Sequence, residues 1–169
     1  MRNDGERVHR GNYAMFLEQV EPDETSVGAW RAGPEDEIFG RYGRTAKRNT
    51  GSLHFNLQPG IITGGQAFAR VVFLDAAKGA SFKLTMAAAG GASECGATAV
   101  VTGKGSGHWV EARLPLTALA ATQDACDQGQ GLVLTQLSGQ ERIVFNLLEV
   151  SKAEFKFALS PWASAAAPA

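Results

Sequence analysis

The amino-acid sequence predicts an all-β domain, an antiparallel β-sandwich with one short helix near its N-terminus. Two observations lead to this fold class. Short segments in which apolar and polar residues alternate follow one another along most of the chain, and glycine-rich turns separate them. Such regular short strands are typical of sandwiches and barrels, because each strand buries one face and then reverses through a turn.

The division of the chain follows from its composition. The 169 residues suit one domain of ordinary size. Residues 1–11 are polar and are expected to be disordered or a linker, residues 12–157 carry the sandwich, and residues 158–169 form an alanine- and proline-rich tail. The polar start lacks the apolar stretch of a signal peptide, which suits a cytoplasmic protein or a fragment of a longer chain, and we favour the fragment.

Residues 12–20 predict the one helix. Their apolar side chains occupy the i, i+3, i+4 and i+7 positions of a single helical face: Tyr13, Phe16, Leu17 and Val20. Asn12 precedes this run and has a side chain suited to an N-cap. We therefore expect a short helix to open the domain.

Several segments predict strands whose buried faces can be assigned. In residues 52–57 and 81–86 every second side chain is apolar: Leu53, Phe55 and Leu57, then Phe82, Leu84 and Met86. Residues 67–75 are apolar on both faces apart from Arg70, and residues 143–150 are nearly continuous in the same way. The short link "AAKG" predicts that 67–75 and 81–86 pair as a central hairpin.

Residues 102–116, "TGKGSGHWVEARLPL", raise the question of where a tryptophan lies. One face carries Val110, Ala112, Leu114 and Leu116, and the other carries Trp109, Glu111 and Arg113. The aliphatic face is expected in the core, which leaves Trp109 at least partly accessible as a platform for a ligand. The glycines before it predict a hairpin turn, since a strand follows them and a phosphate-binding loop needs a helix.

A second aromatic cluster lies in residues 26–44. It combines rings and guanidinium groups in a glycine-rich stretch: Trp30, Arg31, Arg41, Tyr42 and Arg44. This mixture suits a carbohydrate site, because aromatic rings stack on the apolar faces of sugars and arginine binds hydroxyls or carboxylates. The alternative is structural, with both rings in the core and the arginines bound to main-chain carbonyls.

Charge and motifs exclude several classes. The 16 basic and 17 acidic residues give a net charge of -1, so neither nucleic acid nor an anionic membrane is an expected partner. No apolar stretch approaches the ~20 residues that span a bilayer. The three histidines, His9, His54 and His108, lack metal-site spacing, and no GxSxG motif occurs. The acidic run at 34–37 is expected to be a solvated loop.

The two cysteines, Cys95 and Cys126, each lie in a stretch of small polar residues and are predicted to be in loops. If 98–102, 108–116 and 131–137 are successive antiparallel strands, both loops fall at the same rim of the sandwich. The pair is then either a disulfide, which implies an oxidising compartment, or two free thiols.

These segments together resemble the jelly-roll, galactose-binding-like β-sandwich modules attached to secreted bacterial glycan-degrading enzymes, over about residues 12–157. In that family a strand ending in Asp and a glycine hairpin precede a strand of Gly-x-Trp type, and Asp75, Lys78–Gly79 and Gly107–Trp109 match these places. The resemblance implies a jelly roll, glycan binding by loops or by a concave face, and often a structural calcium ion.

We therefore expect a non-catalytic carbohydrate-binding or accessory module of a larger extracellular protein, with a glycan and a neighbouring catalytic domain as partners. Its expected ligand-binding residues are Trp30, Arg41, Tyr42, Arg44 and Trp109. One alternative is a polysaccharide lyase or glycosidase on the same fold, with His54 completing a polar cluster with Arg41, Tyr42 and Arg44. The other is a purely structural domain that packs against a catalytic neighbour.

Overall fold

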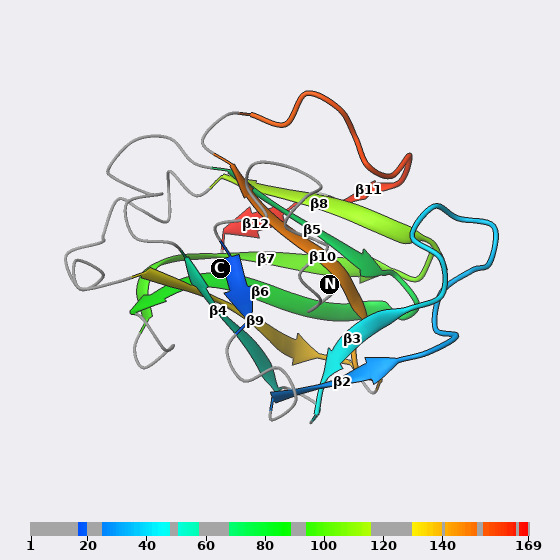
Figure 1. The fold of residues 1–169 in the computed structure, drawn as a ribbon, viewed down its shortest axis with the longest axis horizontal. Helices are drawn as coiled ribbons and strands as arrows, with labels where there is room; N and C mark the ends of the chain where they lie inside the picture. Colours follow the sequence, from blue (N-terminus) through cyan, green and yellow to red (C-terminus); the bar gives the residue numbers. More distant parts are fainter. Residues whose placement is uncertain are drawn as a thin grey trace.

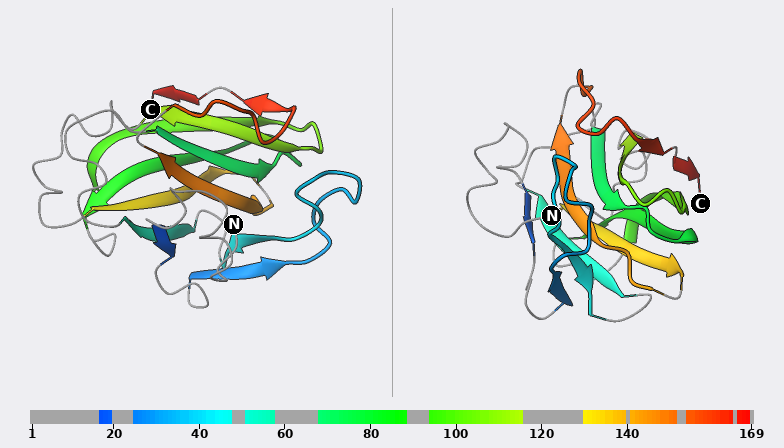
Figure 2. Two further views of the ribbon diagram at one scale, coloured as in Figure 1. Left: turned by 45° about the horizontal axis from the view of Figure 1, so that its top comes forward. Right: turned by 90° about the vertical axis from the view of Figure 1, so that its right-hand side faces the viewer.

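The computed structural model is an all-β, sandwich-like fold of two sheets, shown in Figure 1. It describes residues 17–19, 25–47, 51–57, 68–88, 94–115, 130–139, 141–151, 154–164 and 166–168. These residues form twelve strands in two 6-stranded sheets, which we name sheet A and sheet B. The two layers are seen from other sides in Figure 2.

Neighbouring strands are far apart in the sequence. Sheet A contains, in spatial order, β1 (Leu17–Gln19), β4 (Ser52–Leu57), β9 (Gln130–Ser138), β6 (Lys78–Ala88), β7 (Glu94–Lys104) and β12 (Ala166–Pro168). Sheet B contains β11 (Ala163–Ser164), β8 (Trp109–Pro115), β5 (Phe68–Leu74), β10 (Phe145–Ser151), β3 (Gly43–Ala46) and β2 (Ser26–Ala29). The paired strands are antiparallel, except that β11 runs parallel to β8.

The links from β5 to β6 and from β7 to β8 cross from one sheet to the other. β5 lies in sheet B between β8 and β10, whereas β6 lies in sheet A between β7 and β9. The predicted central hairpin of 67–75 and 81–86 is therefore wrong. The "GKGSG" turn likewise joins β7 of sheet A to β8 of sheet B and is not a hairpin turn. Alternation along a strand determines its buried face, but it carries no information on which strand lies beside it.

The main core lies between the sheets and confirms the predicted buried faces. Phe82 of β6 packs edge-on against Phe73 and Phe145 of sheet B, with ring centroids 5.0 and 5.1 Å apart. Edge-to-face packing is a favourable arrangement for aromatic rings. The other predicted core residues are also buried: Leu53, Phe55, Leu84, Val110, Ala112 and Leu114. The side chains of Leu57 and Met86, and all of Leu116, lie outside the described residues.

Both ends of the described chain form strands that the sequence did not predict. The helix expected over 12–20 is wrong for Leu17–Gln19, which form β1 and pair with β4, while residues 1–16 and Val20 lie outside the described residues. A short apolar run fits either period, and the edge of β4 supplies hydrogen bonds to a strand. The alanine- and proline-rich tail contains β11 and β12, which cover the edges of β8 and β7.

Residues 154–162, which we name the strap, run along the outer face of sheet B between β10 and β11. The strap is fixed largely through its main chain, because the carbonyls of Phe155 and Phe157 accept hydrogen bonds from Arg113 and Arg70. Its Leu159 N–H donates to Glu111 Oε1 over 2.9 Å. The strap therefore covers charged side chains of the sheet.

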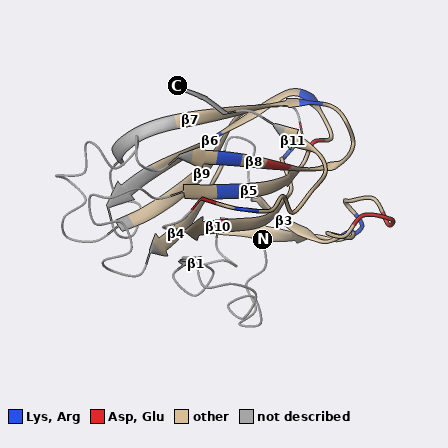
Figure 3. Cartoon of the chain, turned by 90° about the horizontal axis from the view of Figure 1, so that it is seen from above, with Lys and Arg blue, Asp and Glu red and all other residues tan. Residues whose placement is uncertain are grey.

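These charged side chains form a network in the centre of sheet B, and all of them except Arg113 are buried. Arg70 donates to Glu149 Oε2 from two nitrogens, over 2.9 and 3.1 Å, and lies 3.4 Å from Glu111 Oε1. Arg113 Nε donates to Glu111 Oε2 over 2.9 Å. Figure 3 shows the basic segments of β5 and β8 side by side. The two arginines and two glutamates balance in charge, which is the condition for burying ions without a large cost.

Candidate functional site

A group of side chains on β2, β3 and the loop between them forms the candidate site. We name Trp30, Tyr42, Arg44 and Ser26 the aromatic strip. The Trp30 side chain is 77% exposed, and its ring centroid lies 4.4 Å from that of Tyr42 at an interplanar angle of 48°. A Cβ on Gly28 would come within 3.3 Å of the Tyr42 ring, so the absence of a side chain there leaves room for both rings.

Arg44 positions Tyr42 rather than presenting a free charge. It is 8% exposed, and its Nε donates to Ser26 Oγ over 2.9 Å. A second guanidinium nitrogen donates to the Ser26 carbonyl, and a third lies 3.5 Å from the Tyr42 hydroxyl oxygen. Because Tyr42 accepts from Arg44, its own O–H remains able to donate to a ligand.

Arg41 shapes the loop next to the strip. Its guanidinium lies 2.6 Å from Glu35 in an exposed ion pair and also donates to the carbonyl of Arg31. Arg31 has a φ of 60°, in the left-handed region that non-glycine residues rarely occupy. Both arginines of the predicted site thus bind main-chain carbonyls, as the structural alternative expected. The same alternative is wrong for Trp30, which is exposed.

Trp109 lies in a second apolar layer, so the prediction that it is accessible is wrong. Its side chain has no exposed surface and packs with Val72 and Leu74 on the outer face of sheet B. The indole Nε1 donates to the carbonyl of Gly40 over 2.7 Å. A Cβ on Gly33 would overlap with the indole, so the loop after β2 closes tightly over the ring. A ring enclosed in this way cannot serve as a ligand platform.

His54 lies apart from the aromatic strip. Leu53 and Phe55 point into the core, so His54 between them points out from sheet A, whereas the strip belongs to sheet B. The His54 ring is hydrogen-bonded to Ser52 Oγ over 2.9 Å. The polar cluster expected for a lyase or glycosidase is therefore not assembled in the structure.

A contact that sequence reasoning missed joins the loop after β2 to the start of β8. Glu37 Oε1 lies 2.5 Å from His108 Nδ1, and Glu37 Oε2 accepts from the Trp109 N–H over 2.9 Å. The His108 ring stacks on Trp162 of the strap, with centroids 3.8 Å apart and planes 6° from parallel. Glu37 therefore helps to fix the loop above Trp109 and is not a solvated residue of an acidic loop.

The turn between β7 and β8 is organised by one carboxylate. Asp75 accepts from the N–H groups of Lys104, Gly105 and Ser106 and from the Ser106 hydroxyl, over 2.8 to 3.1 Å. Burial disfavours the charged form of Asp75, but these hydrogen bonds outweigh burial and hold the pKa of its carboxyl below the ordinary value. The Ser106 hydroxyl is bound to Asp75, so its position does not suggest a nucleophile activated by His108.

Replacing Asp75 by asparagine is expected to lower the free energy of unfolding at pH 7 by about 1–3 kcal/mol, since an amide cannot accept all four hydrogen bonds. The pKa of the Asp75 carboxyl is lower in the folded than in the unfolded protein, so the charged carboxylate stabilises the fold at pH values above the unfolded pKa. This stabilisation is lost as the pH falls through the folded pKa. The difference between the two proteins should therefore shrink below about pH 4. Urea denaturation across this range measures it. Exposed Asp36→Asn is the control, and a difference independent of pH would contradict the assignment.

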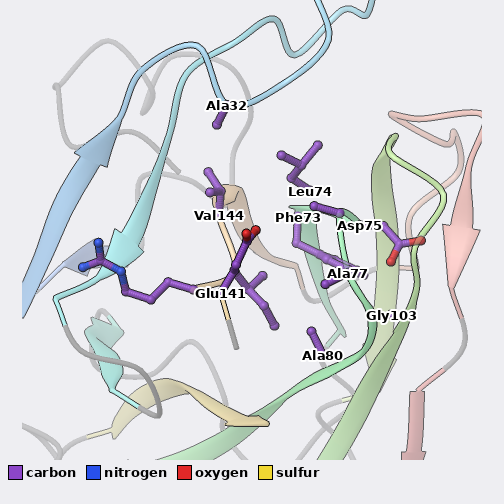
Figure 4. A pocket seen from close by; sticks show the side chains of 12 residues that line it. Ala32, Phe73, Leu74, Asp75, Ala77, Ala80, Gly103, Glu141 and Val144 are labelled. Carbon is purple, nitrogen blue, oxygen red and sulfur yellow. The ribbon is translucent and has the colours of Figure 1, made fainter. Parts of the chain in front are cut away.

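A cleft lies at one end of the sandwich, near the loop that carries Trp30. Its volume is about 230 Å³, and Ala32 of that loop forms part of its wall (Figure 4). The other walls come from the end of β5, the link to β6, Ala80 of β6, Gly103 of β7 and the segment before β10. Val144 lies in this wall and also adjoins Gly43, next to Tyr42 of the aromatic strip.

Comparisons with protein-family models, curated proteins and solved structures found no match. Within the described ranges, no group of three or more His, Cys, Asp or Glu side chains could hold a metal ion, and no helix is long and apolar enough to cross a membrane.

The predicted cysteine pair lies largely outside the described residues. Cys95 belongs to β7, so its placement in a loop is wrong, but its side chain and the whole of Cys126 are not described. Strand β6 separates β7, which carries Cys95, from β9. Ala87 of β6 pairs with Glu94 of β7 on one side and with Gly131 of β9 on the other. The disulfide stays a prediction.

Proposed function

We propose that the chain is a non-catalytic carbohydrate-binding module of a larger secreted, glycan-active protein, and that the aromatic strip binds the glycan. The exposure of Trp30 beside Tyr42 is the observation that carries the proposal. An indole face buries the C–H surface of a pyranose ring, and a neighbouring tilted ring supplies a second contact. The Tyr42 hydroxyl adds a hydrogen-bond donor at the edge of this surface.

We also propose that the sandwich is a jelly roll. The support is the order of the eight strands from β3 to β10. Consecutive strands alternate between the sheets except for β6 and β7, which pair with each other, so that β4, β9, β6 and β7 are neighbours in one sheet and β8, β5, β10 and β3 in the other. Two four-stranded sheets formed in this way are typical of jelly rolls, a fold found in many lectin domains.

The expected ligand is a neutral glycan. The sequence prediction allowed arginine forks to select acidic glycans, but Arg41 is paired with Glu35, and Arg44 is buried and bonded to Ser26 and Tyr42. Neither guanidinium is placed to give a bidentate contact to a sugar carboxylate without breaking its present contacts. Affinity would then come mainly from stacking, which implies weak binding after the cost of ordering a flexible chain.

Trp30→Ala is expected to weaken glycan binding at least about tenfold, because truncation removes the more exposed ring, and a loss of 1.4 kcal/mol already corresponds to a factor of ten. Titration with a panel of neutral and acidic polysaccharides, followed by calorimetry, measures the effect. Phe157→Ala is a matched control, since Phe157 is 80% exposed but lies on the strap. Equal binding by Trp30→Ala and the parent, or no binding by any glycan at millimolar concentration, would reject the strip as the site.

A second candidate function has one observation in its favour. Ile38 and Phe157 are 84% and 80% exposed, and side chains of this size are more often covered. This favours a structural domain that packs against a catalytic neighbour. Ile38→Ser and Phe157→Ser would weaken such packing without changing glycan binding, so the same titrations separate the two candidates.

A further inference from the structure

The walls of the cleft at the end of the sandwich are mainly apolar. They are formed by Phe73, Leu74, Ile143 and Val144, together with alanines at 32, 76, 77 and 80. A cavity of about 150 Å³ with such walls takes up a molecule the size of benzene. The volume here, about 230 Å³, therefore suits a small apolar body rather than a single water molecule.

Most polar groups of the lining already have partners. The Asp75 carboxylate binds the 104–106 turn, and the Arg142 guanidinium donates to the carbonyls of Ala46 and Lys47. The Ile143 N–H donates to the side chain of Gln136, and the Leu74 N–H donates to the carbonyl of Val144. A sugar placed in the cleft would leave most of its hydroxyls without partners, which is costly.

Glu141 is the exception in this lining. Its main-chain carbonyl accepts from Gln136, which fixes the segment, but its carboxylate has no partner among the residues that the structure describes. In Figure 4 this carboxylate lies toward the middle of the lining side chains. Glu141 is exposed, so water screens one side of its carboxylate and its attraction for a cation is modest.

We propose that the cleft binds a primary ammonium group carried on a small apolar body, with Glu141 as the counter-charge. The apolar body would occupy the space lined by Phe73, Ile143 and Val144, and the ammonium would donate to the Glu141 carboxylate. The proposal does not depend on glycan binding by the aromatic strip, because no side chain of the strip lines the cleft.

The test uses three probes of nearly equal shape: cyclohexylammonium, cyclohexanol and cyclohexanecarboxylate. Methyl resonances of Ile143 and Val144 report occupancy of the cleft. The ammonium should bind most tightly and the carboxylate most weakly. Glu141→Gln should weaken binding of the ammonium about fivefold and leave the alcohol unchanged, as expected for one partly exposed charge pair. Exposed Asp36→Asn, outside the cleft, should change neither.

A second variant separates the cleft from a general charge effect. Ala77→Leu fills part of the volume and should weaken binding of both the ammonium and the alcohol. Equal affinity for the three probes, an unchanged preference in Glu141→Gln, or resonance shifts confined to other residues would overturn the proposal. N-acetyl-lysine N-methylamide then identifies the source of the amine: tighter binding than cyclohexylammonium indicates a lysine side chain, and weaker binding indicates a free amine.

Discussion

Replacing Arg70 by methionine is expected to lower the free energy of unfolding by about 3–5 kcal/mol, as is usual when one partner of a buried ion pair is removed. Methionine preserves much of the side-chain length, so the loss comes from the charge. In the interior of sheet B, Glu149 would lose the guanidinium that donates to it twice and Glu111 would lose one of its two cations, and the carbonyl of Phe157 would lose its donor. Urea denaturation at pH 7 measures the change.

Arg113→Met is the matched control for this experiment. Arg113 belongs to the same network and also donates to the strap, but 41% of its side chain is exposed. Water can replace its contacts, so we expect a loss of at most about 1 kcal/mol. Similar losses for the two variants would show that burial of the network is not what makes Arg70 important.

Trp109→Ala is expected to destabilise the protein by about 3–5 kcal/mol, the usual range for removing a large buried ring. The ring fills the layer between sheet B and the loop after β2, and its removal also leaves the carbonyl of Gly40 without a donor. Thermal and urea denaturation, supported by near-ultraviolet circular dichroism, measure the change.

Trp30→Ala provides the comparison, because Trp30 is largely exposed. Its effect on stability should stay within about 0.5 kcal/mol, as for most surface substitutions. The two variants thus separate binding from folding. Trp30→Ala should lose ligand binding and keep its stability, whereas Trp109→Ala should lose stability. A Trp109→Ala protein as stable as its parent would mean that the second apolar layer is not formed.

The alternation of residues predicted the buried faces of strands well, and the assembly of strands poorly. Leu53, Phe82 and Leu84 are buried as expected, because which face of a strand is apolar is a local property. The central hairpin failed because the partners of β5 are β8 and β10, which come much later in the chain. The sequence of residues 67–86 contains no feature that specifies these partners.

The outer face of sheet B shows a second limit of sequence reasoning. The alternation in residues 109–114 separates the two faces of β8, but Trp109 and Glu111 of the outer face are also buried, since the strap and the loop after β2 cover them. A strand face that carries polar residues was expected to be exposed to solvent. Glu111 and Arg70 are instead buried by pairing with each other and with main-chain groups of the strap, which come from distant segments.

The candidate site was predicted in part. Trp30, Tyr42 and Arg44 lie together as expected, since they are on adjacent positions of a two-stranded unit that is close in sequence. The sequence could not show that Arg44 binds Ser26, nor that Arg41 pairs with Glu35. The cleft was missed altogether because its walls come from four separate segments and contain no motif.

During synthesis on the ribosome, β7 and β8 emerge well before β11 and β12, which pair with them. Domains are synthesised from the N-terminus at about 5–20 residues per second, so the edges of both strands would stay unpaired for roughly 2–13 seconds. Unpaired strand edges are templates for pairing with another chain. Neighbouring nascent copies on one messenger RNA would therefore be most at risk of joining along β7 and β8, until β11 and β12 of each copy cover these edges.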